Sequence, residues 1–158
     1  MIEVSIQDQA WVAALPDAAA LARVAAEATL IKVAGPRPGD VAILLADDAA
    51  IRVMNARFRG QDRATNVLSF PAGPGSRGHA GDVALAHGVC VAEALAQGKP
   101  LARHLQHLIV HGVLHLHGYD HEDDAKALVM EGLERRILAD LGAPDPYTAE
   151  QDAEAGHV

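Results

Sequence analysis

The sequence predicts an α/β (α+β) fold in a single domain, with about four strands in a mixed sheet and about five helices. Three observations lead to this prediction. The length of 158 residues suits one domain. Half of the residues are hydrophobic, which allows a sizeable core. Short apolar or alternating segments are separated by both long and short connections, which favours a mixed sheet over a purely parallel one.

Four short segments have the residue pattern of strands. The first and the last alternate apolar and polar residues, which is the period of a half-buried strand. The second contains an uninterrupted apolar run, and the third ends at Pro71, where a Gly- and Pro-rich loop over 71–81 begins. In chain order we expect strands at 2–7, 40–46, 66–70 and 82–87.

Five longer segments have the periodicity or the boundaries of helices. Glycine and proline residues stop the first and the third, and Asp47 or Asp48 can cap the second. In chain order we expect helices at 17–34, about 48–58, 88–97, 101–117 and 122–141. The domain is therefore expected to span 1–143, and the acidic residues 144–158 are expected to form a flexible tail.

Charge and cysteine content narrow the classes of function. The formal net charge of −8 argues against a general nucleic-acid coat. Residues 50–80 nevertheless hold a basic stretch that suits an anionic substrate, although a solvated helix face gives the same pattern. Cys90 is the only cysteine, and no secretory signal or membrane-length apolar run is visible, so we expect a cytoplasmic protein that does not enter membranes.

Three histidines form a candidate metal site on the penultimate predicted helix and the turn after it. His111 and His115 are four residues apart, so a helix places both on one face. His121 follows six residues later, and Gly118 can end the helix and let the chain turn back. Three imidazoles leave a fourth tetrahedral position for water, which is the pattern of a catalytic zinc site rather than a structural one. Nickel, cobalt and iron accept the same ligands.

One position distinguishes this site from that of a zinc peptidase. The histidine spacing equals the zincin pattern H-E-x-x-H-x-x-G-x-x-H, but Gly112 stands where the catalytic glutamate should be. That glutamate takes a proton from water in the peptidases, which a glycine cannot do. Zinc on three neutral histidines also keeps a charge of about +2 when no carboxylate offsets it. The site therefore suits a phosphodiester better than a peptide.

Two other residues are candidates for contacts behind the metal ligands. His107 lies one turn before His111 and could either orient it or compete for the metal. Asp120 could orient a ligand histidine, or it could cap the last helix with Asp123 three residues on. The residue patterns do not identify a general base or an oligomeric state.

The histidine segment resembles a family signature. Residues 111–121, H-G-V-L-H-L-H-G-Y-D-H, are similar to H-G-x-L-H-L-x-G-Y-D-H of the YbeY family, the bacterial rRNA-maturation endoribonucleases. Residues 55–60 (N-A-R-F-R-G), 65–71 (T-N-V-L-S-F-P) and 81–83 (G-D-V) resemble further motifs of that family. His117 departs from the pattern, because the family more often has an apolar residue there.

The resemblance implies a zinc-dependent, single-strand-specific endoribonuclease that acts in 16S rRNA 3′-end maturation and ribosome quality control. Single-stranded RNA, rRNA, ribosomal particles and their associated proteins would be its partners. His111, His115 and His121 occupy the family's ligand positions for one zinc ion, and Arg59 occupies its basic position, thought to contact RNA phosphate. The planar donors of Arg59 suit such a contact on their own account. Closely spaced aromatics are lacking, so backbone contact is expected rather than base stacking.

Three other functions stay open. A zincin-like peptidase or amidohydrolase is disfavoured by Gly112, and peptide cleavage without RNA cleavage would mark it. A non-catalytic, metal-binding ribosome-assembly factor would tolerate mutation of the ligands or have a closed coordination sphere. A metal sensor or store would bind its metal weakly and reversibly.

Overall fold

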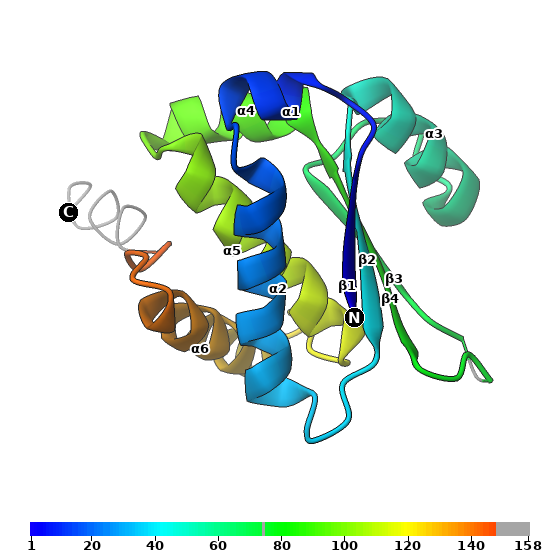
Figure 1. Ribbon diagram of the computed structural model, residues 1–158, viewed down its shortest axis with the longest axis vertical. Helices are drawn as coiled ribbons and strands as arrows, with labels where there is room; N and C mark the ends of the chain where they lie inside the picture. Colours follow the sequence, from blue (N-terminus) through cyan, green and yellow to red (C-terminus); the bar gives the residue numbers. More distant parts are fainter. Residues whose placement is uncertain (74, 148–158) are drawn as a thin grey trace.

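The structure is a computed structural model that describes residues 1–73 and 75–147 (Figure 1). In chain order its elements are β1 (Ile2–Ile6), α1 (Ala10–Ala14), α2 (Ala18–Val33), β2 (Asp40–Ala46), α3 (Asp48–Arg59), β3 (Val67–Pro71), β4 (His79–Ala86), α4 (His87–Gln97), α5 (Leu101–Leu116) and α6 (Asp124–Asp140). Within the described residues there are therefore four strands and six helices.

The four strands form one mixed sheet in the order β1-β2-β4-β3. β1, β2 and β4 run parallel, and β3 pairs antiparallel with β4. The predicted α/β (α+β) class with a four-stranded mixed sheet is thus confirmed. β3 lies at one edge of the sheet, so one side of its backbone has no strand partner among the described residues.

The short helix α1 is the element that the sequence patterns did not predict. It has only five residues, which is too short for a helical period to be recognised. A tertiary contact holds it in place, because Trp11 is fully buried and its indole N–H donates to the carbonyl of Ala46 at 3.0 Å. The remaining helices match the predicted segments within a few residues.

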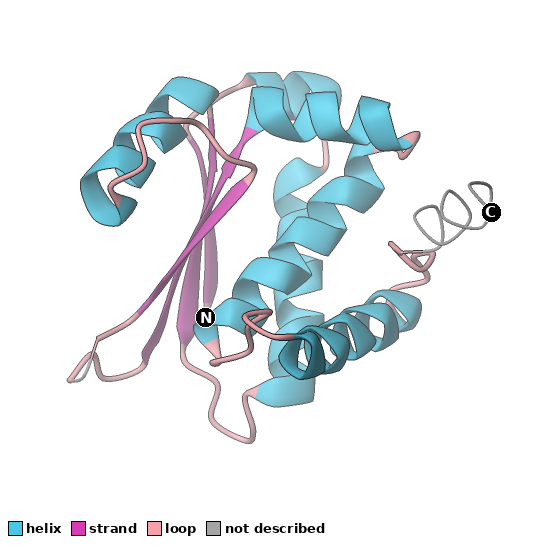
Figure 2. Ribbon diagram, turned by 180° about the vertical axis from the view of Figure 1, so that it is seen from behind, coloured by secondary structure: helices cyan, strands magenta, loops and turns pink. Residues whose placement is uncertain are grey.

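The helices cover the two faces of the sheet unequally (Figures 1 and 2). α2, α5 and α6 lie on one side, and α3 lies on the other, at one end of the strands. The main core lies between the sheet and the larger helical layer, where fully buried Leu45, Leu85 and Ile109 pack together. A smaller cluster that includes Ile51 and Leu68 fixes α3 against the other face.

Gly112 allows α5 to pack closely against the sheet. A Cβ atom at this position would lie 2.8 Å from Val83 Cγ1, which is closer than real Cβ atoms come to a neighbour, and 3.1 Å from Ser69 Oγ, which is a tight contact. The Ser69 hydroxyl on β3 donates to the Gly112 carbonyl at 3.1 Å. This close contact places the histidine-bearing face of α5 beside the edge strand.

The expected tail begins at residue 144, and only its first four residues are described. In these, Asp145 forms an ion pair of 3.1 Å with Arg135 on α6, and the Pro146 carbonyl accepts a hydrogen bond of 2.7 Å from Lys99. The prediction of a flexible tail falls mainly on residues 148–158, which lie outside the described residues. Among the described elements, no helix has both the length and the apolar character needed to cross a membrane.

Candidate metal centre

The structure brings the three predicted histidines together. His111 and His115 occupy successive turns of α5, and their Nε2 atoms are 3.0 Å apart. The helix ends after Leu116, and Gly118 adopts the left-handed conformation with φ of 87°. This reversal returns His121 to the other two, so that one ring nitrogen from each histidine lies within 4.8 Å of the others. The group could therefore hold a metal ion.

The surroundings of His115 favour the neutral imidazole that a metal requires. Burial lowers the pKa of His115, and the neighbouring His111 and His121 lower it further. His115 and His111 are partly buried and His121 is exposed, so the three nitrogens meet at a site open to solvent. Such a donor set can bind a metal and leave a position free for another ligand.

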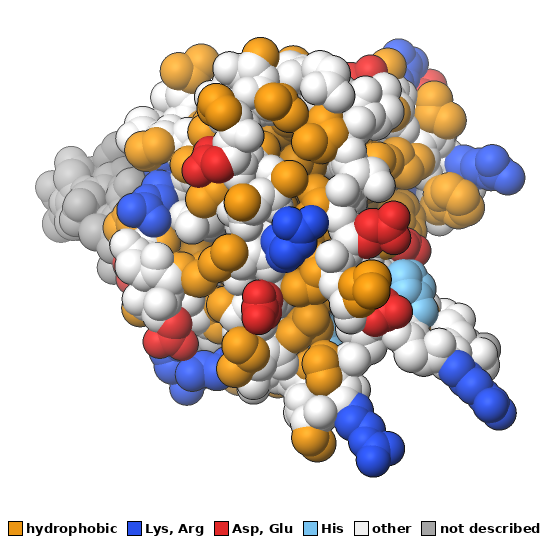
Figure 3. Space-filling view, viewed as in Figure 1, with side chains coloured by type: hydrophobic (Ala, Val, Ile, Leu, Met, Phe, Trp, Pro, Cys, Tyr) orange, Lys and Arg blue, Asp and Glu red, His pale blue; other side chains and the backbone are white. Residues whose placement is uncertain are grey.

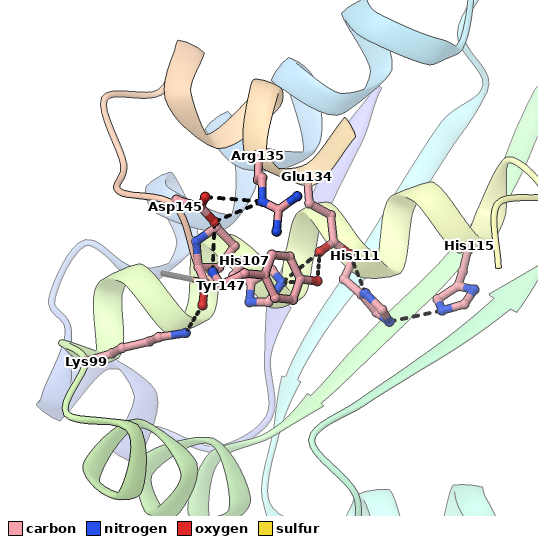
Figure 4. Close-up of polar contacts among 9 residues, drawn as sticks. Lys99, His107, His111, His115, Glu134, Arg135, Asp145 and Tyr147 are labelled. Carbon is pink, nitrogen blue, oxygen red and sulfur yellow. Dashed lines mark hydrogen bonds and ion pairs between the residues drawn. The ribbon is translucent and has the colours of Figure 1, made fainter. Parts of the chain in front are cut away.

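A carboxylate that the sequence reasoning missed lies directly behind His111. Glu134 on α6 is fully buried, and it accepts hydrogen bonds from His111 Nδ1 at 2.6 Å, His107 Nε2 at 3.0 Å and the Tyr147 hydroxyl (Figure 4). Burial raises the pKa of Glu134, but the hydrogen bonds from His107 and His111 outweigh it and lower the pKa to about 2. The ionised carboxylate keeps a proton on His111 Nδ1, so the lone pair of Nε2 faces the candidate metal site.

The sequence contained one weak signal for Glu134. It lies four residues after Met130 and three before Ile137, and all three are buried on the same face of α6. An acidic residue at a core position of an amphipathic helix needs a buried partner. The pattern does not tell which partner, because His111 lies 23 residues earlier and on another helix.

The two residues predicted to lie behind the ligands have different surroundings. His107 contacts Glu134 and thus reaches His111 through the shared carboxylate. Asp120 accepts a hydrogen bond of 3.1 Å from the backbone N–H of Glu122 and lies 3.8 Å from the Lys126 ammonium. The N-cap of α6 is Asp123, whose side chain accepts from Lys126 N–H at 2.8 Å.

An open pocket of about 460 Å³ lies between α5 and the edge strand β3. Arg59 lies on its wall, held by a hydrogen bond from its guanidinium to the Ser69 carbonyl. The described residues that line it include no aspartate or glutamate; they are Arg59, Asn66, Val67, Leu68, Ser69, Pro71, His111, His115 and His121. Its ionisable groups are therefore imidazoles and one guanidinium, and an anionic ligand meets no carboxylate repulsion on these walls.

Comparison with known proteins gives consistent similarities. The family model described as "Endoribonuclease YbeY" matches residues 4–142. Two curated proteins of that description, from Maricaulis maris and Azorhizobium caulinodans, are 47% and 49% identical; the matches cover 99% and 92% of this chain and 97% and 95% of those proteins. A Thermotoga maritima protein solved in solution has the same fold, with a TM-score of 0.55, 23% identity and 95% of both chains covered.

Proposed function

Because the chain belongs to the YbeY family, we propose that it is a metal-dependent endoribonuclease, a hydrolase that cleaves phosphodiester bonds within RNA. One observation carries this proposal beyond the family name. Three imidazoles that converge on a metal position share an open pocket with a guanidinium, and the described walls hold no carboxylate. A phosphodiester is the substrate whose charge fits these walls.

The histidines fit a resident metal in both geometry and chemistry. His111, His115 and His121 would hold the ion, and we assign zinc because three imidazoles with an open position are typical of its catalytic sites. Nickel, cobalt and iron fit the same donors. When bound, such an ion polarises a phosphoryl oxygen and lowers the pKa of water.

Two residues of the chain act around that position. Arg59 is anchored by one donor to the Ser69 carbonyl, and its other N–H groups have no hydrogen-bond partner in residues 1–73 and 75–147, so they can hold a substrate phosphate. Glu134 orients His111 from behind, because it accepts the Nδ1 proton at 2.6 Å. Gly112 packs against Val83, so position 112 offers no proton acceptor to the pocket and a peptidase mechanism is disfavoured.

The finer assignments follow from the family resemblance. We assign the substrate as single-stranded RNA, the process as 16S rRNA 3′-end maturation and ribosome quality control, and the location as the cytoplasm. Ribosomal particles and their associated proteins are then the partners. The histidine segment 111–121 and the segment 65–71 support these assignments, because they match the family's motifs in order and spacing.

The test compares two histidines of the same turn. His115→Ala removes a proposed ligand, whereas His117→Ala removes a ring that hydrogen-bonds to the Val113 carbonyl at 2.8 Å and does not line the pocket. Protein purified without added metal is analysed for bound elements and assayed on end-labelled single-stranded and duplex RNA, with and without chelator. We expect His115→Ala to lose metal and cleavage together and His117→Ala to keep both. Wild-type cleavage by metal-free His115→Ala protein would refute the proposal.

A further inference from the structure

Three side chains at the end of α3 and one on β3 form a cluster that the sequence patterns did not predict. Phe58 on α3 and Phe70 on β3 are twelve residues apart, but their ring centroids are 5.5 Å apart with an interplanar angle of 64°. The guanidinium of Arg57 lies 5.4 Å from the centroid of Phe58, and that of Arg59 lies 5.5 Å from the centroid of Phe70. We call Arg57, Phe58, Arg59 and Phe70 the aromatic–arginine cluster.

Local structure holds this cluster open to solvent. Gly60 ends α3 in the left-handed conformation with φ of 68°, and the buried Asn55 side chain donates to the Arg63 carbonyl at 2.9 Å, which fixes the loop that follows. Phe70 packs partly against the smaller core, whereas Phe58 stays 61% exposed. Single exposed hydrophobic side chains are common, but a large exposed ring grouped with a second ring and two guanidinium groups indicates a binding surface.

The cluster is continuous with the pocket through Arg59. This side chain belongs to the cluster by its contact with Phe70 and to the pocket wall by its hydrogen bond to the Ser69 carbonyl. β3 is the edge strand, so a chain that leaves the pocket can pass over Arg59 without crossing another strand. Such a chain reaches Phe58 and Phe70 next.

The distribution of charged side chains also favours a path of the RNA strand past the end of α3. In residues 1–73 and 75–147, neither Arg57 nor Arg59 is in an ion pair, whereas Arg52 on the same helix is paired with Asp62 at 2.8 Å. Asp82 pairs in register with Phe70 and brings a carboxylate onto the open face of the sheet. Figure 3 shows basic and acidic side chains side by side near α3, and acidic side chains over the strands. The guanidinium groups of Arg57 and Arg59 therefore attract a phosphate backbone to the end of α3. The Asp82 carboxylate lies beside Phe70, 3.2 Å from the His79 ring, and repels the backbone from β4.

We propose that the aromatic–arginine cluster binds an unpaired base of the RNA strand and its phosphate, next to the phosphate held in the pocket. An aromatic ring stacks on any base face, and a guanidinium beside it binds the phosphate of the same nucleotide. A base within a duplex has both faces covered by its neighbours, so the cluster selects single strands. This inference rests on the proposed function. It adds the surface that would make the protein prefer single-stranded RNA to duplex RNA.

The test removes the exposed ring. Binding of a fluorescent single-stranded RNA 12-mer to the metal-loaded protein is measured by anisotropy, with a gel to confirm that the strand is uncut and circular dichroism to confirm the fold. We expect Phe58→Ala to raise Kd about tenfold, which is about 1.4 kcal/mol, and Phe58→Trp to stay within about twofold of wild type. Leu95→Ala is the matched control, because Leu95 is 78% exposed on α4 and should leave Kd unchanged.

A second variant separates stacking from charge. Arg57→Gln should lower the slope of log K against log salt by about 0.7, whereas Phe58→Ala should leave this slope unchanged. If Phe58→Ala protein cleaves RNA normally and binds the strand with wild-type Kd, the proposed role of the cluster is refuted and the proposed function stands. If wild-type protein binds the strand, Phe58→Ala raises Kd as expected, but wild-type protein does not cleave the strand, the proposed function is refuted and the role of the cluster is supported. Wild-type protein that does not bind the strand overturns both.

Discussion

Replacing Glu134 with glutamine should move a proton on a metal ligand while keeping the shape of the core. The amide retains one acceptor oxygen and places an NH₂ donor where the other oxygen was. One Glu134 oxygen accepts from His111, and the other accepts from His107 and Tyr147. The amide oxygen should face the pair of donors, because the opposite orientation leaves two buried donors unpaired at about 1–3 kcal/mol each. The NH₂ group then faces His111 Nδ1.

This orientation changes the tautomer of His111. Nδ1 must accept from the amide, so the proton moves to Nε2, the nitrogen that lies 3.0 Å from His115 Nε2 and faces the metal site. Loss of a carboxylate behind a metal-bound histidine typically costs about 10- to 100-fold in metal affinity. We expect a loss of this size for Glu134→Gln, measured by competition with a chromophoric zinc chelator.

Tyr147→Phe is the control for general damage to the network. It removes the hydroxyl that donates to Glu134 and leaves the contact between Glu134 and His111 intact. It should lower the Tm of the metal-free protein. Zinc affinity should stay within about threefold of wild type, because the 10- to 100-fold loss is expected only for a group that contacts a metal-binding histidine directly. Wild-type zinc affinity in Glu134→Gln protein, with only a lower Tm, would refute the reasoning and make Glu134 a purely structural residue.

Three further predictions test other parts of the fold and site. Arg59→Lys keeps the charge but loses the planar fork, so kcat/KM on single-stranded RNA should fall about tenfold or more at unchanged metal content; wild-type rates would contradict the phosphate contact. Gly112→Ala should lower the free energy of unfolding in urea by about 1–3 kcal/mol, because its Cβ would lie 2.8 Å from Val83, and unchanged stability would mean that α5 can shift. Burial raises the pKa of the Cys90 thiol, so iodoacetamide at pH 8 should modify it only after unfolding, and rapid labelling of the native protein would disprove its burial.

The convergence of the three histidines could be predicted because their geometry is local. His111 and His115 are fixed by one helix, and His121 by the turn that Gly118 makes, so spacing alone determines that they meet. Strand alternation and helix breakers located the larger elements for the same reason. Neither kind of pattern contains the order β1-β2-β4-β3, which depends on how segments distant in sequence pack.

The parts that sequence patterns missed are contacts between elements. Glu134 belongs to α6, and its role arises only because that helix packs against α5. Phe58 and Phe70 were too far apart in sequence to suggest base stacking, and the contact between α3 and β3 brings them together. The expectation of backbone contact came from sequence spacing and stays a prediction. The Phe58–Phe70 pair adds to it the base stacking that we propose.

The position of the carboxylate relative to the histidines argues for the class of reaction. In the zincin pattern the glutamate lies beside the first histidine, where it can reach water on the metal. Here Gly112 takes that place and is covered by Val83, while the carboxylate in contact with His111 comes from behind, through Nδ1. A carboxylate in that position can orient a ligand but cannot take a proton within the pocket. The exposed walls then carry imidazoles and a guanidinium, which stabilise negative charge on a phosphodiester and give a peptide bond no proton acceptor of the zincin kind.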